Sequence, residues 1–67
     1  MKTKEVRQRM KDMNITATQM AKALGMDQST YYRKMQKNGE KFSAVDLTVF
    51  KNTLKLDEGT AVDFLLS

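Results

Sequence analysis

The sequence predicts an all-α fold, and three observations support that prediction. Apolar residues recur three or four positions apart in successive segments, a spacing that places them on one face of a helix. A Ser, Thr or Asp stands just before most of these segments, where its side chain can accept a hydrogen bond from the first turn. No window alternates between apolar and polar residues as a half-buried strand would. A chain of 67 residues is too short for two hydrophobic cores, so residues 1–67 should form one compact domain of five short helices.

The first helix should begin with Thr3 as its N-cap and end near Met13. Its inner face consists of residues spaced i, i+4 and i+7, namely Val6, Met10 and Met13. Its outer face should lie in water and is formed by Arg7, Arg9, Lys11 and Asp12. Asn14 suits the end of this helix, because Asn tolerates the left-handed conformation that often follows a last turn.

The second and third helices should be joined by a tight turn. The segment Thr16-Ala-Thr-Gln19 has the spacing of a capping box, which predicts a helix over residues 17–24. Gly25 should end that helix, since glycine adopts the left-handed conformation without a steric cost. Asp27 should then cap a third helix over residues 28–36.

Two further helices should follow a polar loop over residues 37–41. Ser43 and Asp46 form a second capping box, and Asp57 should cap the last helix over residues 58–66. The fourth helix should bury residues at helical spacing: Leu47, Phe50 and Leu54, with Val45 or Val49 broadening that face. At the end of the chain, Phe64, Leu65 and Leu66 could either close the core or form a dimer interface.

Basic residues are concentrated in the first two thirds of the chain. Residues 1–41 hold ten Lys and Arg against four Asp and Glu, whereas residues 42–67 hold two against four. A positive surface of this kind favours polyanions such as nucleic acid or anionic lipid headgroups. The same distribution would also suit the ordinary charged surface of a small soluble protein.

The third helix should turn its polar side chains outward. Tyr31 and Met35, spaced i, i+4, form its buried face. The side chains left outside are Gln28, Ser29, Tyr32, Arg33 and Gln36. Gln and Arg can bond bidentately to adenine and guanine in the major groove, which a recognition helix enters by its N-terminal end. The alternative is a solvated helix face with nothing bound.

The segment Thr18-Gln-Met-Ala-Lys-Ala-Leu-Gly-Met-Asp-Gln-Ser-Thr-Tyr-Tyr-Arg33 resembles the helix-turn-helix of the Cro and repressor family. That family includes lambdoid phage Cro and the bacterial XRE-like regulators. The resemblance extends over nearly the whole chain and implies a five-helix lambda-repressor-like domain. It also implies a Cro-like repressor of a phage or mobile element that binds double-stranded DNA. Such a protein would bind as a homodimer on a pseudo-palindromic operator, with half-sites ~10 bp apart.

The resemblance further implies roles for individual residues. Base reading would fall on Gln28, Ser29 and Arg33, with Thr30 and Tyr32 as additional contacts. Phosphate contacts would fall on the start of the second helix and on the loop after the third: Thr16, Thr18, Gln19, Gln36, Lys37, Asn38 and Lys41. Lys34 departs from the family pattern, which usually has an apolar residue there, and its ammonium is expected to reach a phosphate. The departure also allows a rotated third helix.

Other functional classes lack the residues that they need. The chain has no His and no Cys, and its three Gly lie too far apart for a P-loop, so neither an enzyme nor a metal or cofactor site is expected. No apolar run suggests a signal peptide or a membrane span, and the absence of Cys fits a reducing cytoplasm, so a cytoplasmic protein is expected. No small-molecule substrate is expected. A rival hypothesis remains a protein-interaction module on the same scaffold, antirepressor-like or antitoxin-like. It is supported by the apolar AVDFLL segment and the acidic balance of residues 42–67.

Overall fold

Four of the five helices begin at the side chain that the sequence predicted as their cap. The computed structural model describes all 67 residues and contains α1 (Thr3–Asp12), α2 (Ala17–Ala23), α3 (Gln28–Gln36), α4 (Ala44–Thr53) and α5 (Glu58–Leu65), with no strand. The side chains that accept a hydrogen bond from the first turn of α2 to α5 are Thr16, Asp27, Ser43 and Asp57. The all-α prediction with five short helices is therefore confirmed.

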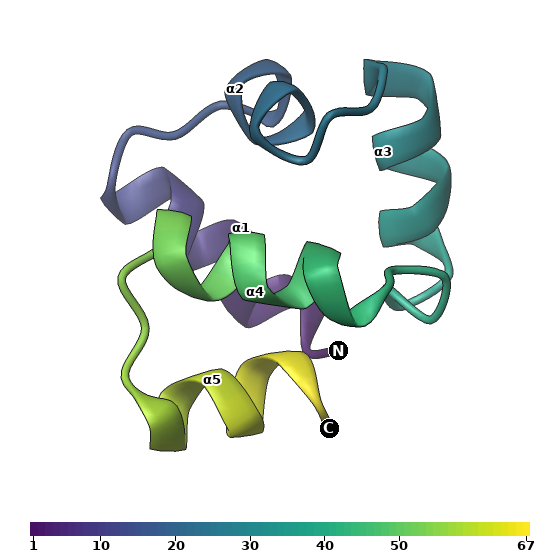
Figure 1. Cartoon of the computed structure of the whole chain (residues 1–67). Helices are drawn as coiled ribbons and strands as arrows, with labels where there is room; N and C mark the ends of the chain where they lie inside the picture. Colours follow the sequence, from purple (N-terminus) through teal and green to yellow (C-terminus); the bar gives the residue numbers. More distant parts are fainter.

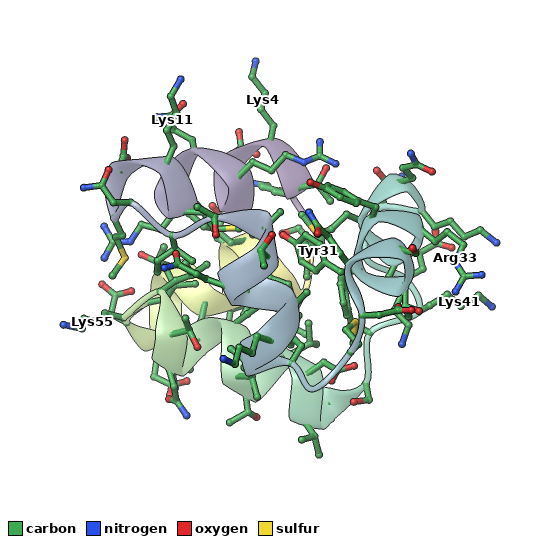
Figure 2. All side chains as sticks on the ribbon, turned by 90° about the horizontal axis from the view of Figure 1, so that it is seen from above. Lys4, Lys11, Tyr31, Arg33, Lys41 and Lys55 are labelled. Carbon is green, nitrogen blue, oxygen red and sulfur yellow. The ribbon has the colours of Figure 1, made fainter.

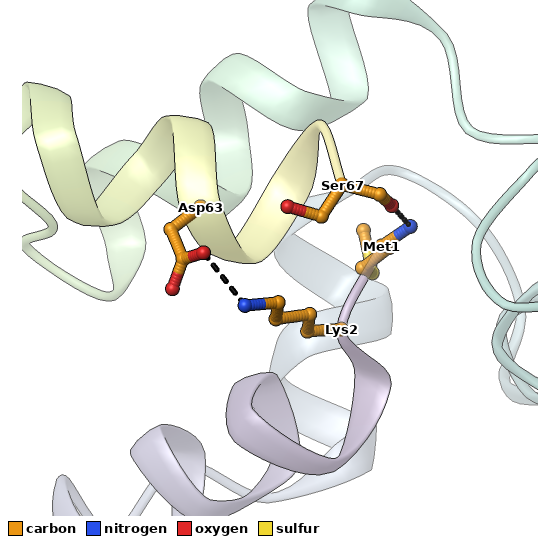
Figure 3. A network of polar contacts seen from close by, with 4 residues as sticks. All are labelled: Met1, Lys2, Asp63 and Ser67. Atoms are coloured by element: carbon orange, nitrogen blue, oxygen red, sulfur yellow. Dashed lines mark hydrogen bonds and ion pairs between the residues drawn. The ribbon is translucent and has the colours of Figure 1, made fainter.

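The start of α1 differs from the prediction. Thr3 is the first residue of the helix, Lys2 is the N-cap, and no side chain accepts a hydrogen bond there. Lys2 instead contacts α5, where its N–H donates to the Phe64 carbonyl at 2.7 Å. The Lys2 ammonium also lies 2.6 Å from the Asp63 carboxylate, and the Met1 amine donates to the Ser67 carbonyl at 2.7 Å (Figure 3). The beginning of α1 is thus held against the end of α5.

Arg9 is a second correction on α1, since it was expected to face water. Its side chain is half-buried, and the Nε and Nη2 atoms donate to the carbonyls of Leu54 at 3.0 Å and Lys55 at 3.4 Å. These carbonyls follow the last turn of α4, where backbone acceptors lack partners and the helix dipole favours a cation. Arg9 therefore ties α1 to the end of α4.

One hydrophobic core holds the five helices together. Its twelve buried side chains are Val6, Met10, Met20, Ala21, Tyr31, Met35, Phe42, Phe50, Leu54, Leu56, Ala61 and Leu65. Phe42 and Phe50 pack edge to face with ring centroids 5.0 Å apart, a favourable aromatic geometry. Of the two residues expected to broaden the buried face of α4, Val49 is half-buried, whereas Val45 is 73% exposed. The Val45 alternative is therefore wrong. Val45 precedes Phe50 by five positions, which turns it away from the core.

The arrangement of the helices leaves the outer side of α3 uncovered. Figure 1 shows α2 nearly end-on at the top, with α3 descending beside it, so the two helices cross at a steep angle. α2 packs against α3 and α4, and α1 packs against α5. Gly25, in the turn between α2 and α3, has φ +71°, the left-handed conformation predicted for it. The molecule measures 29 × 24 × 20 Å, and none of its helices is long and apolar enough to cross a membrane.

Candidate nucleic-acid interface

The exposed side of α3 carries the side chains that the sequence assigned to base reading. Tyr31 and Met35 are each 2% exposed and anchor the helix in the core. The residues turned outward are Gln28, Ser29, Tyr32, Arg33 and Gln36, all of them exposed. Thr30, the remaining candidate, is half-buried beside Arg33. On a helix of 3.6 residues per turn, Tyr32 and Arg33 lie toward opposite edges of this face, with Ser29 and Gln36 between them.

Two hydrogen bonds hold side chains of this face in place. The Gln28 amide nitrogen donates to the Tyr32 hydroxyl at 3.3 Å, one turn further along α3. The Arg33 Nη2 atom donates to the Thr30 hydroxyl at 3.2 Å. Both bonds are local, and each leaves the outer donors of the amide or guanidinium free for another partner.

Asp27 sets where α3 begins. Its carboxylate accepts a hydrogen bond from the Thr30 N–H at 2.9 Å. Hydrogen bonding from the side chain and the backbone of Thr30 holds the pKa of Asp27 below its usual value, so the carboxylate is charged at neutral pH. This supports the interpretation of Asp27 as a cap for α3.

A basic depression borders α3 on the side of Arg33. Its volume is about 220 Å³, and its lining consists of Thr30, Arg33, Lys34, Lys37 and Lys41, with no carboxylate. Figure 2 shows Arg33 and Lys41 extending on the same side of the molecule. Four positive side chains without an acidic partner produce a strong local attraction for anions. Three of the predicted phosphate contacts, Lys34, Lys37 and Lys41, therefore gather at one place.

Lys34 lies between the hydrophobic core and the basic depression. Its ammonium lies 5.8 Å from the centre of the Phe42 ring, within the range of a cation–π contact. Lys34 is half-buried, while Met35 fills the adjoining core position. Met35 thus packs in the core, and the charge of Lys34 stays at the basic depression.

The predicted phosphate contacts at the start of α2 are exposed but partly engaged. The Thr16 hydroxyl accepts from the Gln19 N–H at 3.1 Å, and the Gln19 side chain accepts from the Thr16 N–H at 2.8 Å. This capping box engages the hydroxyl oxygen of Thr16 and the amide oxygen of Gln19, and it leaves the Gln19 amide nitrogen free to donate. Thr18 is exposed. The N–H groups of Ala17 and Thr18 come before the first N–H that donates within α2, so neither has a partner in the helix. Thr18 is accordingly the freest of the three residues.

The remaining predicted site residues lie apart from α3 or at its end. Gln36 and Asn38 are exposed where α3 runs into the following turn, and Asn38 has φ +57°.

The predicted dimer residues at the end of the chain do not share one environment. Leu65 belongs to the core at 7% exposed, Phe64 is half-buried against the core, and Leu66 is 66% exposed. Leu65 therefore closes the core, which leaves Leu66 as the exposed member of the three.

Arg7 and Lys11 of α1 also border α3, although they were expected only to face water. They line a depression together with Tyr32 at the other edge of the exposed face. Figure 2 shows Lys4 and Lys11 projecting from the same side of α1. The spacing of Arg7 and Lys11, i and i+4, placed them on one face of a helix. Only the packing of α1 shows that this face adjoins α3.

Comparisons with protein-family models, curated proteins and solved structures found no match. No group of three His, Cys, Asp or Glu side chains is placed to hold a metal ion. The site is therefore defined by its own geometry: a polar helix face with a basic depression at one edge and, at the other, a mostly apolar depression that Arg7 and Lys11 border.

Proposed function

We propose that this protein is a sequence-specific regulator of transcription that binds double-stranded DNA through α3. The observation that carries the proposal is the exposed polar face of α3, anchored by Tyr31 and Met35 and bordered on both edges by unpaired cations. Major-groove recognition needs a protruding helix with hydrogen-bonding side chains and flanking positive charges for the phosphates. The polar face of α3 meets both requirements.

In this proposal, the first turn of α3 reads bases. The Gln28 amide can bond an adenine edge, Arg33 can bond a guanine edge, and Ser29 can bond either. Thr30 and Tyr32 would add contacts at the two edges of the face. The side chains of Lys34, Lys37 and Lys41 would bind phosphates on one strand, which makes affinity fall steeply as salt rises.

The regulator would act in the cytoplasm as a Cro-like repressor that occupies an operator and excludes polymerase. A homodimer would place two copies of α3 in successive major grooves, ~10 bp apart, on a pseudo-palindromic site. The protein would need neither a cofactor nor a catalytic group.

Selection of binding sites from a random duplex pool tests this proposal. Wild type and the Gln28→Ala, Arg33→Ala double variant would be compared near physiological salt, with Lys55→Gln as a control. Lys55 is exposed and lies on the other side of the molecule from Arg33 (Figure 2). We expect a palindromic consensus with wild type and control, and its loss in the double variant. A folded wild-type protein that enriches no sequence would refute the proposal.

A second candidate function is a protein-interaction module of antirepressor or antitoxin type. The observation that favours it is a groove of about 150 Å³ between α4 and α5, lined mainly by apolar residues, beside which Val62 and Leu66 are exposed. Retention on DNA cellulose against salt separates the two candidates. The module would elute early and without sequence preference, whereas the regulator would be retained.

A further inference from the structure

The largest depression on the molecule has an apolar floor. It occupies about 580 Å³ where α1, the start of α2 and α3 come together, and Figure 2 labels Tyr31 in this region. Met10, Ile15, Ala17 and Tyr31 contribute to its lining. Ligand sites for small molecules are concavities of this size, with mostly apolar walls and few polar groups.

The rim of this depression is positively charged. Arg7 and Lys11 lie one turn apart on α1, and no carboxylate belongs to the lining. The two ion pairs of the molecule, Lys2 with Asp63 and Lys51 with Glu58, involve neither of them. Neither side chain makes a hydrogen bond within the chain. Both charges are therefore available to an anion.

Tyr31 and Met10 both line this depression, and a buried hydrogen bond joins their side chains beneath its floor. Tyr31 is only 2% exposed, and its hydroxyl donates to the Met10 sulfur at 3.4 Å. A thioether is a poor acceptor, so exchanging it for a carboxylate oxygen would strengthen the hydrogen bond. Burial raises the pKa of Tyr31, which keeps the hydroxyl protonated as a donor.

We infer that this depression binds a small amphipathic carboxylate, its apolar body on the floor and its charge at Arg7, Lys11 and the Tyr31 hydroxyl. A nucleic-acid phosphate could contact the cations at the rim but not the floor, because an apolar lining offers it no hydrogen-bond partner. The inference concerns the isolated protein and holds whether or not α3 binds DNA.

A titration followed by amide NMR shifts would test the site with three probes. 3-Phenylpropionate carries both an aromatic body and a carboxylate, 3-phenylpropanamide lacks the charge, and acetate lacks the apolar body. We expect saturable shifts with 3-phenylpropionate that are confined to the residues around the depression, and at least roughly tenfold weaker binding of the other two. Equal binding of the amide would overturn the inference, as would shifts spread over the whole surface. Concentration-dependent shifts of the same residues without any probe would also overturn it, because the face would then bind a second copy.

Variants separate the charge from the hydroxyl. Arg7→Gln removes a rim cation at an exposed position, Tyr31→Phe removes only the buried hydroxyl, and Lys4→Gln is the matched control on α1 outside the depression. We expect the first two to weaken 3-phenylpropionate binding severalfold to tenfold, and the control to leave it unchanged. If Tyr31→Phe unfolds the protein, Arg7→Gln decides alone. An unchanged affinity in Arg7→Gln would overturn the inference.

Discussion

At the scale of single residues, Asp27 makes the stability of the start of α3 depend on pH. The pKa of its carboxyl is held below the ordinary value of 3.8 by hydrogen bonding from Thr30, and Asp57 is held low in the same way by Thr60 at the start of α5. The folded state therefore binds protons at these sites more weakly than the unfolded state. The stabilisation that results is present above pH 3.8 and is lost as the pH falls through the folded values.

Replacing both caps by Asn should flatten this part of the acid response. Asn also caps helices well but does not titrate, so the Asp27→Asn, Asp57→Asn variant should lose less of its stability in acid than wild type. The measurement is the melting temperature by circular dichroism from about pH 6 down to about pH 2, the range over which paired carboxylates protonate. An acid response as steep as that of wild type would contradict the role given to these two carboxyl groups.

Residue positions were predictable where the cause is local. Thr16, Asp27, Ser43 and Asp57 cap their helices as predicted, because each needs only its own first turn. Arg9 was wrongly expected to face water, since its acceptors are the carbonyls of Leu54 and Lys55, which follow α4 and lie 45 and 46 residues along the chain. The burial of Leu65 likewise depends on how α5 packs, which spacing alone does not fix.

At the scale of elements, the turn between α2 and α3 depends on Gly25. Its φ is +71°, and a Cβ added there would meet no atom within 4 Å. The cost of Gly25→Ala should therefore come from the backbone alone, about 1–2 kcal/mol of unfolding free energy. Urea unfolding would measure it. Since the substitution leaves the packing intact, the unfolding cooperativity should not change.

Gly59 is the matched control for this measurement. It lies in the first turn of α5, and an added Cβ would come no closer than 3.8 Å to the Asp57 carboxylate. Gly59→Ala should leave stability unchanged or raise it by about 0.5 kcal/mol, because Ala loses less entropy in a helix. A Gly25→Ala protein as stable as Gly59→Ala would show that the left-handed turn does not constrain α2 against α3.

Helix bounds followed closely from these stop and start signals, with the second and fifth predicted helices each one residue too long.

At the scale of the whole molecule, the sequence was less informative. It predicted the polar face of α3, but not that Arg7 and Lys11 of α1 lie at its edge. The helical period places Arg7 and Lys11 on one face of α1. Which helix lies next to that face depends on how α1 packs against the other helices. The depression with the apolar floor is also a product of that packing and has no signature in any single segment.

The assembly of two copies is the property of the whole molecule that the proposed operator requires. Val62 and Leu66 are 53% and 66% exposed beside the groove between α4 and α5, on a surface distant in sequence from α3. An apolar surface of this kind can be buried by a second copy in a two-fold dimer.

Val62→Glu with Leu66→Glu should therefore abolish cooperative binding to a two-half-site duplex, while binding to a single half-site persists. Val45→Glu is the matched control, because Val45 is 73% exposed but does not line the groove. Gel-shift titrations on both duplexes would measure the difference. Cooperative binding that survives in the double variant would place the dimer contact elsewhere on the protein.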